Sequence, residues 1–254
     1  MEYHPGKFVW FEHLSHDIPK ARAFYGTLFG WRSDPVEMGG EAPYPMIQNG
    51  EQGIGGFREG PPNVRVHWVP YLSVPDVDAS FKAATAAGAR ALMQPTDFGA
   101  AGRAAALADP TGASFAIWKG AQGDRPDVAE IAMGDWYWNE LVTTDEKKAL
   151  AFYEGTFGFT GEGMDMGPMG TYYLLKKDGT PRAGLMKAPA PEDGSNWLPY
   201  VRVADCDAST AKAQSLGARI AMPPRDIPNI GRFSVLIDPL GAAIAVMRGQ
   251  PAAQ

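Results

Sequence analysis

The stretch from Trp10 to Gly30 reads WFEHLSHDIPKARAFYGTLFG, and it decides the fold because the chain repeats it. The second copy, from Trp138 to Gly158, reads WNELVTTDEKKALAFYEGTFG and starts 128 residues later. Each copy opens with large apolar and aromatic residues, which are typical of a half-buried strand. Asp17 then suits a helix N-cap, the following apolar residues recur at helical spacing, and Gly30 suits a left-handed C-cap. The stretch therefore predicts a strand followed by a helix, twice.

Two further blocks repeat at nearly the same distance. The block that begins at Trp68 and continues with Pro70-Tyr71 returns at Trp197, 129 residues later. A third block, around the Asp-Pro-x-Gly turn of 109–112, returns at 238–241. A period this long indicates a duplicated domain rather than a solenoid. Any functional site must therefore be sought in both copies.

Composition narrows the class of protein. The 254 residues have room for two domains of ordinary size, each large enough to bury its own core. The net charge is −6 and no cluster of Lys and Arg stands out, so nucleic acid and anionic membranes are poor partners. No apolar run is long enough to cross a bilayer and the start lacks a signal peptide's apolar core, which predicts a cytoplasmic protein. The single Cys206 excludes an internal disulfide and a cysteine-based metal cage.

Within each copy the strand and helix are followed by three strands, and then the whole pattern begins again. In the first copy we expect strands over 8–15, 31–38, 43–48 and 53–57 around a helix that Gly30 ends. A second set follows, with strands over 67–74, 90–94, 103–108 and 114–119 and a helix over 76–87. The fold class predicted is α+β, with four βαβββ units forming two domains over 1–121 and 134–250. Residues 122–133 are expected to be the linker and 251–254 a tail.

This combination resembles the vicinal oxygen chelate superfamily, which includes glyoxalase I, bleomycin-resistance and fosfomycin-resistance proteins, and extradiol dioxygenases. The resemblance rests on the Asp-capped helix ending in Phe-Tyr-x-x-x-Phe-Gly, the Asp-x-Asp-Ala after a later strand, and the Asp-Pro-x-Gly before the last strand, in both copies. The Trp-x-Glu opening and the tandem arrangement look like the two-domain glyoxalase-like branch. The resemblance implies paired βαβββ units whose sheets curl into an open barrel, or cup, around a small-molecule cavity.

Enzymes of that superfamily usually hold one divalent ion with His, Gln or Glu from the first, fifth and last strands of a copy. The matching positions here are Trp10, Val69 and Ala116 in the first copy, and Trp138, Leu198 and Ala245 in the second. None of these side chains coordinates a cation. The sequence therefore predicts no metal centre and no cofactor in either copy.

Two carboxylates share a strand face with the first-strand positions, because side chains alternate along a strand. Glu12 lies on the face of Trp10, and Glu140 lies on the face of Trp138. Flanked by aromatic residues, each carboxylate would be desolvated, with a raised pKa that suits a general base or acid near neutral pH. The alternative is a structural carboxylate satisfied by backbone N–H groups, a Tyr or an Arg.

Aromatic residues near these positions predict a pocket for a planar or apolar ligand. The candidates are Trp10, Tyr44, Trp68, Trp138, Tyr172 and Trp197, of which we expect only some to reach a cavity. His67 joins them as a candidate partner of Glu12, but its counterpart is Asn196, so a hydrogen-bonding histidine is the stronger interpretation. Arg103 and Arg232 are expected to pair with a nearby Asp rather than to clamp a substrate.

Two functions of different classes follow from these residues. One is a metal-independent lyase or isomerase with Glu12 or Glu140 as the base. The other is a non-catalytic binding or sequestering protein, as the bleomycin-resistance proteins are in this superfamily. A metal-dependent glyoxalase or dioxygenase is disfavoured by the missing ligands. In each case the partner is a small organic molecule, and the chain is expected to be a monomer or a homodimer.

Overall fold

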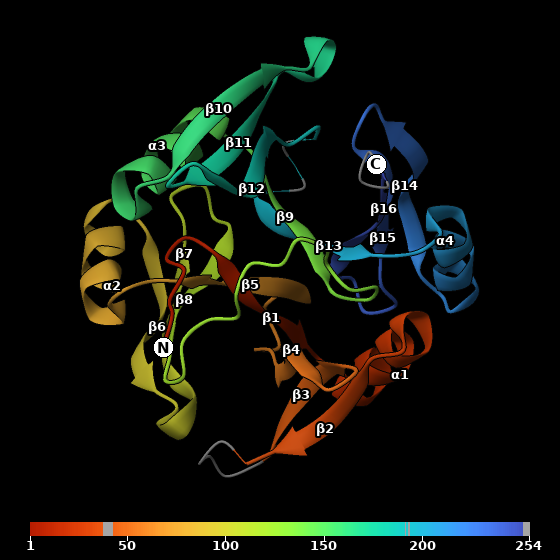
Figure 1. The fold of residues 1–254 in the computed structure, drawn as a ribbon, viewed down its shortest axis with the longest axis horizontal. Helices are drawn as coiled ribbons and strands as arrows, with labels where there is room; N and C mark the ends of the chain where they lie inside the picture. The colour runs from red at the N-terminus through yellow and green to blue at the C-terminus, as the bar shows by residue number, and fades with distance from the viewer. Residues whose placement is uncertain (38–42, 191, 193, 251–254) are drawn as a thin grey trace.

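Two curled eight-stranded sheets, with four helices outside them, make up the protein in the computed structural model (Figure 1). The structure describes residues 1–37, 43–190, 192 and 194–250. The first sheet is built from the first copy of the repeat and the second sheet from the second copy. The predicted tail, 251–254, and the last residue of the predicted strand 31–38 lie outside the described residues.

Each half contains two βαβββ units, which confirms the predicted α+β fold. The first half consists of β1 (Phe8–Ser15), α1 (Ile18–Phe29), β2 (Arg32–Val36), β3 (Tyr44–Asn49), β4 (Gln52–Glu59), β5 (His67–Ser73), α2 (Val77–Ala86), β6 (Arg90–Asp97), the short 3-10 helix η1 (Gly99–Ala101), β7 (Gly102–Ala108) and β8 (Ser114–Gly120). The second half consists of β9 (Trp136–Thr143), α3 (Glu146–Phe157), β10 (Thr160–Asp165), η2 (Gly167–Met169), β11 (Thr171–Lys177), β12 (Thr180–Lys187), β13 (Asn196–Arg202), α4 (Cys206–Ser215), β14 (Arg219–Ile227), β15 (Gly231–Ile237) and β16 (Ala243–Gly249).

Local sequence explains where the four helices begin and where two of them end. In each helix the carboxylate of an N-cap aspartate accepts a hydrogen bond from the backbone N–H three residues later. The four N-caps are Asp17, Asp76, Asp145 and Asp205. Helices α1 and α3 end at Gly30 and Gly158, whose φ angles of +77° and +66° are left-handed and cost glycine no Cβ clash.

The strand order places the repeated opening strand in the middle of each sheet. The order is β2-β3-β4-β1-β5-β8-β7-β6 in the first sheet, and the second sheet repeats it as β10-β11-β12-β9-β13-β16-β15-β14. Strand β1 pairs in parallel with β4 and antiparallel with β5, so it joins the two βαβββ units. The side chains of these central strands therefore form the floor of each cup.

The two halves share their hydrophobic cores. One core cluster joins Tyr25 and Trp68 of the first half to Val201 of the second, and the other joins Phe115 of the first half to Tyr153 of the second. Strand β13 lies against β5 and β8, so the convex faces of the two sheets pack together at the centre of the molecule. Two further clusters lie within single halves, one around Val69 and one around Leu198, and the predicted domain bounds stay a prediction.

Polar contacts also cross between the halves. Helix α1 lies beside α4, and α2 lies beside α3 (Figure 1). Tyr25 on α1 donates to Asp238 at 2.8 Å, and Tyr153 on α3 donates to Asp109 at 3.1 Å. Both aspartates belong to the Asp-Pro-x-Gly turns, so each turn anchors the first helix of the other half. His13 adds a buried contact of 2.9 Å between its Nε2 and Asp238 Oδ2.

Candidate functional site

The central strand β1 sends alternate side chains to opposite faces of the first sheet. Phe11 and His13 point into the core shared with the second half and are 2% and 0% exposed. Trp10 and Glu12 line a cavity on the concave face. The first cup is therefore floored by an aromatic residue and a carboxylate, on the face that strand alternation predicts.

The cavity in the first cup has a volume of about 740 Å³, which is in the usual range for small-molecule sites. Its wall includes the aromatic side chains of Trp10, Tyr71, Phe98 and Trp118. The ring of Trp118 lies 6.3 Å from that of Tyr71 and 6.4 Å from that of Phe98. Residues 122–125, at the start of the predicted linker, contribute to the same wall. The cup thus offers a large aromatic surface. At its edge lie residues 122–125, where the chain passes to the second half.

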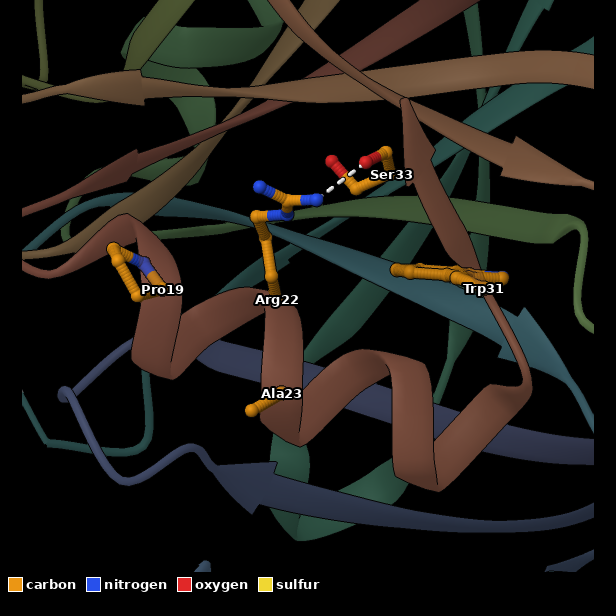
Figure 2. Close-up of a pocket in the computed structure, with 5 residues that line it drawn as sticks. All are labelled: Pro19, Arg22, Ala23, Trp31 and Ser33. Atoms are coloured by element: carbon orange, nitrogen blue, oxygen red, sulfur yellow. Dashed lines mark hydrogen bonds between the residues drawn. The ribbon is translucent and has the colours of Figure 1, made fainter. Parts of the chain in front are cut away.

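A smaller hollow of about 400 Å³ lies between α1 and the start of β2 (Figure 2). The charged side chain in its lining is Arg22, whose Nη2 donates to the carbonyl oxygen of Ser33 at 2.6 Å, as the dashed line in Figure 2 shows. This hollow brings together neither a carboxylate nor a group of aromatic rings. The first cup is therefore the candidate site.

Glu12 is held by three donors from three strands. Its Oε1 accepts from the Tyr44 hydroxyl at 2.9 Å, and its Oε2 accepts from the Tyr71 hydroxyl and from Arg58 Nε, each at 2.9 Å. The side chain of Glu12 is only 5% exposed. A buried carboxylate is costly unless it is paired and hydrogen-bonded, and here both conditions are met.

Tyr44 reaches Glu12 because the strand next to it carries a glycine. A Cβ atom on Gly56 would lie 2.0 Å from the Tyr44 hydroxyl oxygen, so only glycine leaves room for this ring. Burial, followed by the nearby Glu12 carboxylate, raises the pKa of Tyr44 and of Tyr71 well above the ordinary value. Both phenols therefore keep their protons and act as donors.

Arg58 caps the carboxylate from the cavity side. Burial is the largest single effect and works against its charge, but attraction to Glu12, the hydrogen bond to Glu12 and the two tyrosines together outweigh it and raise the pKa of Arg58 above its ordinary value. Its guanidinium carbon lies 5.8 Å from the centre of the Tyr44 ring and 5.7 Å from that of Phe98, both within the range of a cation–π contact. The side chain remains 42% exposed, so a firmly held cation faces the cavity.

The second cup repeats the carboxylate and the tyrosines but not the cation. Glu140 accepts a hydrogen bond of 3.2 Å from Tyr200 and another from Tyr172. Met186 stands where the first cup has Arg58, because Gly184 pairs with Glu140 as Gly56 pairs with Glu12. Burial raises the pKa of Glu140, and the two tyrosine hydrogen bonds only partly oppose this effect. The corresponding carboxyl groups are therefore ion-paired in one cup and raised in pKa by burial in the other.

Four of the predicted ligand residues come together in matching pairs. Trp10 Nε1 donates to the Tyr44 hydroxyl at 3.1 Å, and Trp138 Nε1 donates to the Tyr172 hydroxyl at 3.0 Å. In each cup the indole thus extends the hydrogen-bond chain that ends at the glutamate. The ligand-binding role of these residues stays a prediction.

Trp68 and Trp197 do not line the cups, which corrects their assignment to the pocket. Trp68 is 2% exposed and donates to the Tyr25 hydroxyl at 3.1 Å, while Trp197 is 4% exposed and donates to the Tyr153 hydroxyl at 3.2 Å. Trp68 directly precedes the cup-facing Val69, and Trp197 directly precedes the cup-facing Leu198. Because side chains alternate along a strand, both tryptophans point to the opposite face, into the shared core.

His67 lies outside the cavity lining. Its Nδ1 is 2.7 Å from the carbonyl oxygen of Arg65, and burial lowers its pKa. This contact fits the hydrogen-bonding interpretation rather than a ligand set with Glu12. The two arginines also behave as expected, since Arg103 pairs with Asp78 and Asp97, and Arg232 pairs with Asp207 and Asp226.

Several residues of the first cup were not predicted from the sequence, among them Arg58, Tyr71, Phe98 and Trp118. Tyr71 was within reach, because it lies two residues after Val69 and shares its face. Arg58 could also have been found from the sequence, because the two copies differ at this position: the second copy has Met186. Phe98 lies in the loop after β6, where no strand periodicity applies.

Paired βαβββ units whose sheets curl around a cavity define the class of the protein, and the family comparison agrees. Residues 10–118 match the model of the glyoxalase-like domain, and residues 136–246 match that of the Glyoxalase/Bleomycin resistance protein/Dioxygenase superfamily. The chain therefore belongs to the vicinal oxygen chelate superfamily, with two domains of that kind.

Individual relatives cover nearly the whole chain. The "Putative glyoxylase CFP32" of Mycobacterium tuberculosis is 36% identical over 98% of this chain and 97% of its own length. The anthracycline biosynthesis protein DnrV of Streptomyces peucetius is 31% identical over 98% of this chain and 96% of its own length. The Mn(II)-bound glyoxalase from Novosphingobium aromaticivorans superposes with a TM-score of 0.64, at 18% identity, over 97% of this chain and 82% of that one. This last likeness shows the fold.

The residues present do not fit the divalent ion that the superfamily usually holds. In the first cup Val69 and Ala116 pack on the cup face with Trp10, and in the second cup Leu198 and Ala245 pack on that face with Trp138. Those side chains offer no lone pair that a cation would take. Across residues 1–37, 43–190, 192 and 194–250, no three His, Cys, Asp or Glu side chains gather in a way that could hold a metal ion.

Among the described residues, no helix is both long and apolar enough to span a membrane. The cytoplasmic location and the monomeric or homodimeric state stay predictions.

Proposed function

We propose that this protein binds a planar small organic molecule in its first cup, without a divalent ion at the superfamily's usual position. The observation that carries the proposal is the 740 Å³ cavity, whose wall holds the rings of Trp10, Tyr71, Phe98 and Trp118. Aromatic side chains supply large contact areas and favour stacking on a flat ligand. The name of the Streptomyces relative refers to anthracycline biosynthesis, and anthracyclines contain a flat polycyclic ring system, which supports a ligand of this shape.

Binding without catalysis by Glu12 agrees with the hydrogen bonds around that carboxylate. A general base must be within hydrogen-bond reach of a substrate proton and must have a free lone pair for it. Three donors, including the Arg58 guanidinium, already occupy three of the roughly four lone-pair sites of Glu12, which leaves a single site, on Oε1. Glu12 therefore positions Arg58 and the two tyrosines, and the wall around it supplies the affinity.

A titration tests the proposal. Anthraquinone-2-carboxamide, a neutral planar probe, is expected to bind with one molecule per chain when followed by calorimetry, both before and after treatment with EDTA. Trp118→Met, which installs the residue of the second copy (Met247), is expected to weaken binding by about fivefold to tenfold, or about 1.0–1.4 kcal/mol, because a stacking ring is lost. Arg232→Met, which removes the equivalent surface ion pairs in the second half, outside the cavity lining, is the control and should leave binding unchanged. Loss of binding with EDTA, or equal binding by Trp118→Met, would contradict the proposal.

A second function, a metal-independent lyase or isomerase, is favoured by one observation. Burial raises the pKa of Glu140, which carries no cationic partner and is the type of group that general acid–base catalysis uses near neutral pH. If this function holds, Glu140→Gln abolishes turnover of the substrate while Glu12→Gln does not. Equal activity of wild type and Glu140→Gln would exclude it.

A further inference from the structure

We propose that Arg58 is the anchor for an anionic oxygen of the ligand, so that the first cup selects planar aromatic acids over neutral molecules of the same shape. The inference rests on the proposed function, which supplies the flat ligand, and it adds the charge of that ligand. The guanidinium of Arg58 is hydrogen-bonded to Glu12 on one side and contacts the rings of Tyr44 and Phe98, and it faces the cavity.

The guanidinium is fixed by contacts that use only part of its hydrogen-bonding capacity. Arginine has five N–H groups and no acceptor. Nε–H of Arg58 donates to Glu12, and the group also contacts the Tyr71 oxygen. In the part of the chain that the structure describes, no further acceptor meets the Nη atoms, and 42% of the side chain is exposed in the cavity. The remaining N–H groups can donate to a carboxylate, which arginine often binds through two parallel hydrogen bonds.

Two aromatic rings, those of Tyr44 and Phe98, hold the guanidinium of Arg58 in its orientation. The guanidinium carbon is 5.8 Å from the Tyr44 ring centre and 5.7 Å from the Phe98 ring centre. Contacts with both rings restrict rotation of the long side chain, so little side-chain entropy remains to be lost on binding. A flat acid can therefore lay its rings on Trp118, which neighbours Phe98, while its carboxylate meets Arg58.

The ion pair with Glu12 does not cancel this effect, because its two charges lie at different depths. Glu12 is 5% exposed at the floor and Arg58 is 42% exposed above it, so the positive end of the pair faces the ligand. The other charged residues in the cavity wall are Glu59, Asp124 and Arg125. Asp124 accepts from Ser73 and from the backbone of His4, and Arg125 donates to Asp135 at 2.9 Å. At the linker side the two carboxylates of Asp124 and Asp135 stand beside the one cation, Arg125, which disfavours an anion there. Arg58 is balanced by the single buried carboxylate of Glu12, so we place the anion at Arg58.

The second cup is an internal comparison for this assignment. It keeps the glutamate and both tyrosines but has Met186, Ile227 and Met247 at the positions of Arg58, Phe98 and Trp118. The carboxylate and tyrosines thus form a stable cluster without the arginine. Replacing Arg58 by methionine makes the first cup resemble an arrangement that this chain already folds.

The experiment compares two probes that differ in charge and match in shape, anthraquinone-2-carboxylate and anthraquinone-2-carboxamide. Calorimetry with the full chain at pH 7 is expected to give at least tenfold tighter binding for the acid. Arg58→Met should bring the acid down to the affinity of the amide and change binding of the amide by less than threefold. Arg58→Lys, which keeps the charge but not the paired N–H groups, should fall between them. Arg232→Met, outside the cavity lining, should match the wild type.

The outcomes separate this inference from the proposed function. Tight binding of both probes with no preference for the acid overturns the role of Arg58 and leaves the planar-ligand proposal standing. Absence of binding for both probes contradicts the proposed function and this inference with it. The comparison of acid and amide in the wild type needs no variant, so the result holds even where Arg58→Met folds poorly.

Discussion

Replacing Gly56 by alanine is expected to dismantle the donor set around Glu12. The new Cβ atom would lie 2.0 Å from the Tyr44 hydroxyl oxygen and 2.2 Å from Cζ of that ring, far below the 3.0 Å that real Cβ contacts respect. The tyrosine must therefore move by about 1 Å or more. A hydrogen bond of 2.9 Å to Glu12 and one of 3.1 Å from Trp10 do not survive such a shift.

The size of the effect follows from those two bonds. A hydrogen bond to a charged group contributes about 1.5–3 kcal/mol, and one between neutral groups contributes about 0.5–1.5 kcal/mol. Gly56→Ala should thus lower the free energy of unfolding by roughly 2–4 kcal/mol. The second cup predicts the same for Gly184→Ala, where the new Cβ would lie 1.9 Å from the Tyr172 hydroxyl.

Urea denaturation of single and double variants measures this coupling. If the tyrosine ring is the obstacle, Gly56→Ala should cost little in a Tyr44→Ala background, and the cycle should return a coupling energy close to the cost of Gly56→Ala alone. Gly155→Ala is the control, because that exposed glycine of α3 has open space around it and alanine should stabilise the helix by about 0.5–1 kcal/mol. The reasoning is refuted if Gly56→Ala unfolds at the wild-type urea concentration.

Three further predictions concern the other buried charges. Burial favours a higher pKa for Asp238, but hydrogen bonding and attraction to His13 outweigh burial and lower the pKa. This pair therefore stabilises the fold above the unfolded aspartate pKa of about 3.9. The stabilisation is lost as the pH falls through the pKa of Asp238 in the folded state. His13→Leu, which installs the residue of the second copy, should cost about 1–3 kcal/mol at pH 7 and flatten the acid limb of the stability curve; an unchanged acid limb would contradict this. The raised pKa of Glu140 means that the folded chain binds the carboxyl proton more tightly than the unfolded chain does. The free energy of unfolding of the wild type should therefore fall as the pH rises from about 4.3, by at most about 1.4 kcal/mol per pH unit. Denaturant titrations at successive pH values measure this slope, and Glu140→Gln should remove it. Met186→Arg should lower the pKa of Glu140, so its infrared carboxyl band should convert to the ionised position at a lower pH than in the wild type. Conversion at the wild-type pH would count against the equivalence of the two cups.

Most of the fold could be predicted because its signals are local and occur twice. Asp17 and Gly30 fix the ends of α1 by backbone geometry alone, and their counterparts do the same for α3. The predicted strand over 8–15 and β1 have the same bounds. What local signals could not show is that the cores are shared between the halves, since the partners of Tyr25 and His13 lie more than 200 residues away.

The candidate site was predicted only in part, for a related reason. Strand alternation places Trp10 and Glu12 on one face without knowledge of their partners. The same rule, applied from Val69, would have assigned Trp68 to the core and Tyr71 to the cup. Arg58 lies beyond such reasoning, because its role depends on a contact between β4 and β1 rather than on its own strand.

The difference between the copies carries more functional information than their likeness. A carboxylate held by two tyrosines occurs in both cups, as do the glycines that let one tyrosine of each pair approach, so this cluster is explained by the architecture of the cup alone. Arg58 is not needed to satisfy that cluster, since Glu140 lacks an arginine and shifts its pKa instead. A cation that the scaffold does not require, exposed beside an aromatic wall, is the feature most easily explained by a ligand. We therefore expect substitutions at Glu12 to act first on stability, and substitutions at Arg58 to act first on the choice of ligand.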